Sequence, residues 1–200
     1  MTTGLSRKDL PSLPMAPPAG RQPTAKICLI GDERVGKTSL IQRFVHGVYS
    51  PAYLRTIGAV VSKRSIPLPK EGDLPVTMNL MVWDVMGKKV FMDLLGEAYF
   101  AGAQAVLAVF DVTRPETLAN LRPWVAGVRD IVGPVPAILL ANKVDLVQER
   151  RVSADEIDPV AKEFGMAWYP ASALTGENVE AAFRELAVLC RRNQLGSPSS

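Results

Sequence analysis

The sequence is poor in cysteine, in long apolar runs and in clustered charge of one sign, and each shortage argues against a class of protein. The two cysteines, Cys28 and Cys190, lie in an expected first strand and near the end of an expected last helix, so we expect both to be reduced. No apolar run approaches the ~20 residues that a membrane-spanning helix needs. A net charge of +3 without a block of interleaved basic and aromatic residues argues against nucleic-acid binding.

Targeting and lipidation signals are also missing from the sequence. The N-terminus has no apolar signal core, the second residue is threonine rather than glycine, and residues 195–200 contain no cysteine box. We therefore expect neither a secretory signal nor a lipid anchor. The expected location is the cytoplasm, which also agrees with reduced cysteines.

Length and composition predict one α/β domain between two irregular ends. A chain of 200 residues with 48% hydrophobic content is long enough for one domain with a buried core. Residues 1–25 repeat Pro, Ser and Gly without apolar periodicity, and we expect them to form a disordered tail. We assign the folded domain to residues 26–192 and a flexible C-terminus to residues 193–200.

The most informative stretch is residues 31–38, Gly-Asp-Glu-Arg-Val-Gly-Lys-Thr, which lies between an apolar strand and an amphipathic helix. This spacing fits a P-loop, in which backbone N–H groups and the helix N-terminus bind a polyphosphate. Lys37 is expected to reach the terminal phosphates, and the Thr38 hydroxyl to bind Mg²⁺. An ordinary strand-to-helix turn is the alternative, but the flanking strand and helix favour the P-loop. The predicted phosphate-binding residues are Glu33, Arg34, Val35, Gly36, Lys37, Thr38 and Ser39.

Strands and helices alternate along the rest of the chain. A polar loop over residues 47–58 precedes a predicted hairpin, with strands at residues 59–67 and 75–84 and a turn at residues 68–74. An irregular helix is expected before residue 100, buried strands at residues 105–110, 135–141 and 167–170, and helices at residues 115–132, 153–164 and 177–192. This order predicts an α/β fold of the P-loop NTPase type, a three-layer sandwich around a mostly parallel six-stranded sheet with one antiparallel strand.

Two residues at the end of the strand at residues 75–84 and just beyond it are candidates for the phosphate and metal site. Asp84 is placed like the second carboxylate of a P-loop site, which holds Mg²⁺ through water; a helix-capping aspartate is the alternative. Gly87 offers a backbone N–H that can approach a γ-phosphate without steric obstruction. Because the carboxyl ends of parallel strands meet at one edge, we expect the P-loop, Asp84 and Asn142 to converge.

Residues 142–145, Asn-Lys-Val-Asp, predict which base is bound. A carboxylate at Asp145 accepts both the ring N–H and the exocyclic amine of guanine, whereas adenine has no such pair of donors. The order of P-loop, Asp-x-x-Gly and Asn-Lys-x-Asp therefore favours a guanine nucleotide. It disfavours an ATP-using kinase or ATPase.

With residues 171–178, Ala-Ser-Ala-Leu-Thr-Gly-Glu-Asn, the chain from residue 26 to 192 resembles the Ras-like small GTPases and has a Rab-type character. The resemblance implies that the protein binds GTP and GDP with Mg²⁺, hydrolyses GTP and acts as a switch. It implies an effector that binds the switch regions, an activating protein and an exchange factor. It also implies a monomer or a nucleotide-dependent dimer.

The same resemblance implies roles for individual residues. The Ala173 backbone amide is expected to contact the guanine oxygen, Lys143 to lie along the nucleotide, and Tyr49 to pack against the base edge. Thr56 stands at the switch I threonine, whose hydroxyl and carbonyl reach Mg²⁺ and the γ-phosphate. The implied metal ligands are Thr38, Thr56 and Asp84; the implied base-binding residues are Asn142, Lys143, Asp145, Ser172, Ala173 and Leu174; the implied catalytic residues are Lys37, Thr56, Gly87 and Lys88.

The chain departs from the family at Lys88, where the family's switch II has a water-orienting glutamine. Lysine has no acceptor for a proton of the attacking water, so we expect slow intrinsic hydrolysis. Glu33 and Arg34 replace small residues; Glu33 repels the γ-phosphate unless it faces solvent or pairs with Lys88 or Arg34. Arg34 is either a solvent-facing charge or a finger acting in cis. These departures leave open a pseudo-GTPase, a binding module that holds nucleotide without cycling.

Overall fold

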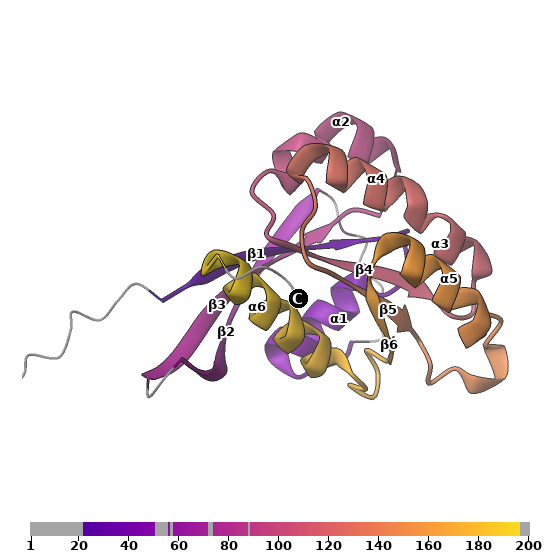
Figure 1. The fold of residues 1–200 in the computed structure, drawn as a ribbon. Helices are drawn as coiled ribbons and strands as arrows, with labels where there is room; N and C mark the ends of the chain where they lie inside the picture. Colours follow the sequence, from indigo (N-terminus) through magenta and orange to yellow (C-terminus); the bar gives the residue numbers. More distant parts are fainter. Residues whose placement is uncertain (1–21, 51–55, 57, 72–73, 88, 197–200) are drawn as a thin grey trace, which may run out of the picture.

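The computed structural model describes residues 22–50, 56, 58–71, 74–87 and 89–196. Six strands form one sheet in the order β2-β3-β1-β4-β5-β6, with helices on both faces (Figure 1). The strands are β1 (Thr24–Ile30), β2 (Ala59–Glu71), β3 (Leu74–Val85), β4 (Ala105–Asp111), β5 (Ala137–Asn142) and β6 (Ala167–Ala171). The predicted three-layer sandwich with a mostly parallel six-stranded sheet is confirmed.

The β2–β3 hairpin supplies the antiparallel pairing, as predicted, but it is longer than the prediction. The turn predicted at residues 68–74 is wrong over most of its length, because β2 continues to Glu71 and β3 begins at Leu74. Pro69, which with Gly72 suggested the turn, lies on β2, an edge strand of the sheet. An edge strand tolerates proline because its outer N–H groups need no partner strand.

The described helices are α1 (Lys37–His46), α2 (Lys89–Phe100), α3 (Pro115–Ala119), α4 (Leu121–Val132), α5 (Ala154–Phe164) and α6 (Val179–Gln194), with a short 3₁₀ helix, η1 (Val147–Glu149). The single helix predicted over residues 115–132 is wrong, since Asn120 separates α3 from α4. Pro123 explains the break, because it has no N–H to donate to the Ala119 carbonyl one turn earlier. No described helix is long and apolar enough to cross a membrane.

Regular structure begins and ends slightly outside the predicted domain boundaries. Residues 24 and 25 belong to β1, and residues 193 and 194 form the end of α6, although the sequence analysis assigned them to the irregular ends. The rest of the predicted tail at residues 1–21 and the chain end at residues 197–200 lie outside the described residues.

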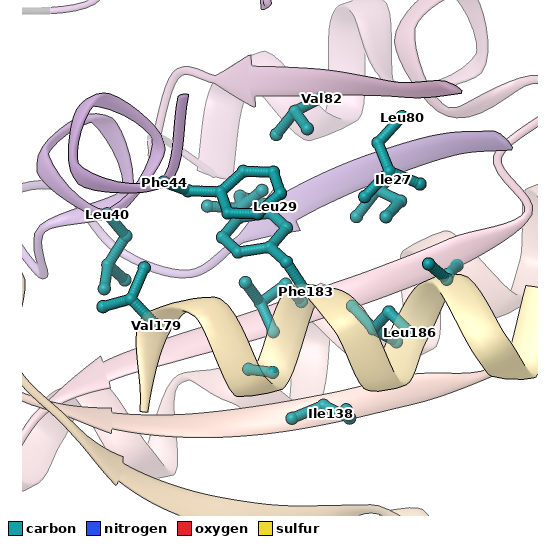
Figure 2. Close-up of a cluster of buried hydrophobic side chains, with 14 of the residues drawn as sticks. Ile27, Leu29, Leu40, Phe44, Leu80, Val82, Ile138, Val179, Phe183 and Leu186 are labelled. Atoms are coloured by element: carbon teal, nitrogen blue, oxygen red, sulfur yellow. The ribbon is translucent and has the colours of Figure 1, made fainter. Parts of the chain in front are cut away.

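Two apolar clusters, one on each face of the sheet, hold the layers together. On one face, Phe44 of α1 stacks on Phe183 of α6 with ring centroids 3.9 Å apart (Figure 2). On the other face, Trp124 of α4 and Phe164 of α5 pack in a cluster with Phe110 of β4. Since helices cover both faces, every residue of β4 is buried, which explains the unbroken apolar run in its sequence.

Candidate nucleotide-binding site

The loop between β1 and α1 wraps around the ammonium group of Lys37. This residue opens α1, is 7% exposed, and donates from Nζ to the carbonyls of Gly31 at 2.7 Å and Asp32 at 2.8 Å. Burial lowers the pKa of Lys37 to about 8, against the opposing effect of Asp84 and other nearby carboxylates. The loop thus places a buried cation beside a helix N-terminus, an arrangement that favours a bound polyphosphate.

Two glycines allow close backbone contacts around this loop. Gly36 has φ +101°, and a Cβ built on it would lie 2.3 Å from Nδ2 of Asn142. The same Nδ2 donates to the Val35 carbonyl at 2.7 Å, so the base motif is bonded to the P-loop. A Cβ on Gly87 would lie 2.5 Å from the carbonyl carbon of Asp32. Both approaches require a residue without a side chain.

Three oxygen-bearing side chains meet beside Lys37. Thr38 Oγ1 donates to Asp84 Oδ2 at 2.5 Å. Thr56 Oγ1 lies 3.0 Å from Thr38 Oγ1 and donates to the same Asp84 oxygen at 3.2 Å. Burial raises the pKa of Asp84, and the hydrogen bond from Thr38 and the charge of Lys37 oppose this effect. The cluster joins α1, the loop before β2 and the end of β3.

This cluster has the donor set that suits Mg²⁺. The second carboxylate oxygen of Asp84, Oδ1, is buried and has no hydrogen-bond partner within the described part of the chain. Carboxylate and hydroxyl oxygens are hard ligands of the kind that Mg²⁺ prefers. Thr38, Thr56 and Asp84 are therefore the residues that would hold the ion. In the described ranges, no group of three His, Cys, Asp or Glu residues offers another metal site.

Predicted base-binding residues come together at the carboxyl ends of β5 and β6. Ser172 Oγ donates to Asp145 Oδ1 at 2.5 Å and accepts from the Thr175 amide at 3.0 Å. The Ala173 amide donates to Asn142 Oδ1 at 3.3 Å. The loop at residues 172–175 is thereby tied to both Asn142 and Asp145, two residues of the predicted guanine motif.

Sequence reasoning missed a buried carboxylate, Asp111, at the end of β4. Its Oδ2 pairs with Lys143 Nζ at 2.6 Å and with Arg114 Nε at 3.2 Å. Arg114 Nη2 also donates to the Glu33 carbonyl in the P-loop at 2.9 Å. Burial alone would raise the pKa of Asp111, but hydrogen bonds from Lys143 and Thr113 outweigh it and hold the pKa below its ordinary value. An aspartate closing a buried strand, as Asp84 does on β3, was the available signal.

A second missed contact involves the side chain of Asp32. Its Oδ2 accepts from Asn120 Nδ2 at 2.7 Å, and its Oδ1 accepts from Trp124 Nε1 at 3.1 Å. The P-loop is thus bonded to the start of α4. No local pattern around Asn120 or Trp124 indicates this contact.

The other predicted P-loop residues differ in burial. Val35 is buried, Glu33 and Ser39 are half-buried, and Arg34 is exposed with φ +64°. Both interpretations of Arg34, a solvent-facing charge and a finger acting in cis, therefore stay predictions.

The structure says little about the roles of three further predicted residues. Tyr49 and Leu174 are 39% and 47% exposed. Lys88, the residue that replaces the family's glutamine, lies outside the described residues. The pairing of Glu33 with Lys88 considered above therefore stays a hypothesis.

The sheet order and the P-loop at the β1–α1 junction define a P-loop GTPase fold. Residues 26–192 match the model of the Ras family, and the chain belongs to this family. It is similar to Ras-related protein Rab-13 of Bos taurus, with 34% identity over 163 residues, 81% of this chain and 77% of the relative. It is also similar to Ras-related protein Rab-8B of Dictyostelium discoideum, with 32% identity over 191 residues, 92% of this chain and 91% of the relative.

These relatives confirm the predicted Rab-type character. A third, Ras-related protein Rab-1 of Theileria parva, is 33% identical over 177 residues, 88% of this chain and 78% of the relative. Proteins of this family are GTP hydrolases that bind guanine nucleotides, generally with Mg²⁺. They interact with effectors, activating proteins and exchange factors.

Proposed function

We propose that this small GTPase is a GTP/GDP switch with slow intrinsic hydrolysis. The observation that supports switching is the contact of Thr56 with Thr38 and Asp84. Thr56 belongs to the loop between α1 and β2, whereas Thr38 and Asp84 sit on regular elements. A loop that contacts the metal site through a threonine hydroxyl is ordered or released according to the bound nucleotide.

In this proposal, different residues bind the phosphates, the guanine base and Mg²⁺. Lys37 and the N-terminus of α1 stabilise phosphate charge, and the Gly87 N–H approaches the γ-phosphate across the P-loop. Asp145, positioned by Ser172, accepts the two donors of guanine. When bound to Thr38, Thr56 and Asp84, Mg²⁺ neutralises phosphate charge.

Slow hydrolysis is inferred from the chemistry of Lys88. A glutamine in this position both donates to and accepts from the attacking water, and so orients it toward the γ-phosphate. A lysine ammonium donates only. It attracts phosphate oxygens and favours GTP binding, but it gives the water no acceptor.

A pseudo-GTPase is the second candidate, and the same residue favours it. If no other group positions the water, GTP remains bound and the switch loops present a constant surface to a partner. The binding residues of the P-loop and the base motif are the same under both proposals, so affinity alone does not distinguish them.

Single-turnover hydrolysis of preloaded GTP with Mg²⁺ tests the proposal, comparing wild type with Lys88→Gln. We expect slow turnover in wild type and a rate at least about tenfold higher in the variant, since glutamine orients the attacking water toward the γ-phosphate. Lys162→Gln, the same change on the exposed surface of α5, is the matched control and should leave the rate unchanged.

Each other outcome changes the conclusion. Rapid hydrolysis by wild type would contradict the slow rate and show that another group positions the water. Stable GTP binding with no turnover in either protein would favour the pseudo-GTPase.

A further inference from the structure

The side chain of Arg43 contacts the loop at residues 172–176, which the proposed function assigns to the guanine base. Arg43 is in the last turn of α1, on the opposite end of that helix from Lys37. Its Nε donates to the Ala173 carbonyl at 2.9 Å, and its Nη2 donates to the Leu174 carbonyl. One guanidinium therefore binds two consecutive carbonyls of a loop that is distant in sequence.

The same side chain also holds the end of its own helix. Arg43 Nη1 donates to the Gly47 carbonyl at 3.1 Å, while the Gly47 amide donates to the Arg43 carbonyl at 3.0 Å. Gly47 caps α1 with φ +70° and begins the segment that leads to Thr56. Arg43 is thus bonded both to the base loop and to the start of the switch I loop.

Packing reinforces these hydrogen bonds. A Cβ built on Gly176 would lie 3.7 Å from Cδ of Arg43, so the loop backbone rests on the aliphatic part of the arginine. The loop closes on itself through the Gly176 amide, which donates to the Ser172 carbonyl at 2.8 Å. The turn at residues 172–176 is therefore a compact unit that Arg43 supports from the α1 side.

The orientation of two peptide groups follows from these contacts. In a trans peptide the C=O and the next N–H point in opposite directions. Because the Ala173 carbonyl faces Arg43, the Leu174 N–H points away from Arg43. Fixing the Ala173 carbonyl also restricts rotation about the bonds of Ala173. The Ala173 amide, which the resemblance places at the guanine oxygen, donates to Asn142 Oδ1 in this structure.

We propose that Arg43 is a positioning residue for guanine recognition, which holds the backbone of residues 173 and 174 in place at the loop that binds the base. The inference rests on the proposed function, in that it assumes a guanine nucleotide beside Ala173. The planar guanidinium suits this role because its fixed fork binds several carbonyls at once, whereas a lysine ammonium is a point charge on a flexible stem.

The test measures the affinities of wild type, Arg43→Lys and Arg184→Lys for three diphosphates: GDP, 6-thio-GDP and IDP. 6-thio-GDP keeps both donors for Asp145 but replaces the base oxygen by sulfur, a weak acceptor. IDP keeps the oxygen and lacks the exocyclic amine. Arg184→Lys is the matched control, because Arg184 donates to the Pro67 carbonyl, between α6 and β2.

We expect Arg43→Lys to bind GDP about tenfold more weakly and to lose most of the preference for GDP over 6-thio-GDP. Its preference for GDP over IDP, which reports on Asp145, should be unchanged, and Arg184→Lys should match wild type in both preferences. Hydrogen exchange of the amides in residues 172–176 of the GDP complex should be faster in Arg43→Lys alone.

Failures of the two proposals are distinguishable in this experiment. Equal weakening of all three nucleotides by Arg43→Lys, or unchanged amide exchange, would overturn the positioning role and leave Arg43 as a structural contact. If wild type itself does not prefer GDP over 6-thio-GDP, the guanine contact assigned to Ala173 is wrong, whatever the variant does.

Discussion

Asp111 is a buried carboxylate that joins the base motif to the phosphate loop. Its side chain is 1% exposed and pairs with Lys143, which belongs to the base motif, and with Arg114, which donates to the P-loop at Glu33. A buried carboxylate without cations would be costly, but here two cations and Thr113 satisfy it. One residue therefore couples two halves of the site that are separate in the sequence.

Replacing Asp111 by asparagine should lower the free energy of unfolding by about 1–3 kcal/mol at neutral pH. The expected loss is below the ~3–5 kcal/mol of a fully buried pair, because the side chains of Lys143 and Arg114 are 32% and 34% exposed. Urea unfolding of wild type and Asp111→Asn at one fixed GDP concentration measures the difference.

The same comparison has a defined pH dependence. The folded-state pKa of Asp111 lies below the ordinary value of 3.8, so its stabilisation is present above that value and lost as the pH falls through the folded-state pKa. The difference between the two proteins should stay constant from about pH 8 to about pH 5 and shrink at lower pH. A difference that already disappears at neutral pH would show that the charge of Asp111 does not stabilise the fold.

At the scale of elements, α4 is an anchor for the P-loop as well as a cover for the sheet. Its Trp124 packs in the core with the indole ring and donates from Nε1 to Asp32, whose backbone carbonyl accepts from Lys37. Asn120, at the junction with α3, binds the other carboxylate oxygen of Asp32. The break between α3 and α4 thus coincides with a contact to the site.

Trp124→Phe keeps an aromatic ring in the core and removes the hydrogen bond to Asp32. We expect GDP dissociation to become about two- to tenfold faster, in line with the net free energy of one hydrogen bond. Asn120→Ala, which removes the second donor from an exposed position, should act in the same direction. Release of a fluorescent GDP analogue into excess unlabelled GDP measures the rate.

A matched control is available on another element. Trp168 on β6 donates to Asp158 of α5 at 2.7 Å, so Trp168→Phe loses a similar bond without altering the P-loop contacts. Its dissociation rate should equal that of wild type. If Trp124→Phe and Trp168→Phe release GDP equally, the contact of α4 with Asp32 does not position the P-loop.

At the scale of the whole molecule, α1 and α6 connect the phosphate loop and the base loop to one apolar layer of the core. α1 begins at the phosphate loop, α6 begins just after the base loop, and Phe44 and Phe183 stack between them (Figure 2). Arg64 of β2 adds to this layer, since it lies over the Phe44 ring at 4.3 Å and pairs with Glu180 of α6 at 2.6 Å. The relative position of the two binding loops therefore depends on the packing of this face.

Phe183→Ala should lower the free energy of unfolding by about 3–5 kcal/mol, because Phe183 is fully buried and its removal leaves a cavity. Phe183→Leu, which retains most of the volume, should cost less than about 1.5 kcal/mol. Denaturant unfolding at constant GDP concentration gives both values. Equal costs for the two variants would mean that the space left by the ring collapses and that the stacked pair contributes little.

Much of the fold and of the site was predictable because the corresponding signals are local. The P-loop lies within residues 31–38, and the buried strands appear as short apolar runs, so neighbouring residues contain the information. Some local signals were misleading. Pro69 suggested a turn, but it lies on β2, and the sequence around it does not show that β2 is an edge strand, where proline is tolerated. Likewise, periodicity alone merged α3 with α4.

The amino-acid pattern alone was enough for the sheet type, the P-loop and the guanine motif, since each of these is specified by the order and spacing of a few residues. Folding was required to bring Arg43 to Ala173, 130 positions away, and Asn120 to Asp32, 88 positions away. Such contacts have no sequence signature, because nothing in a local pattern states which distant carbonyl or carboxylate an arginine or asparagine will bind. They arise when the parallel sheet aligns the ends of its strands and the covering helices bring their side chains to the same edge.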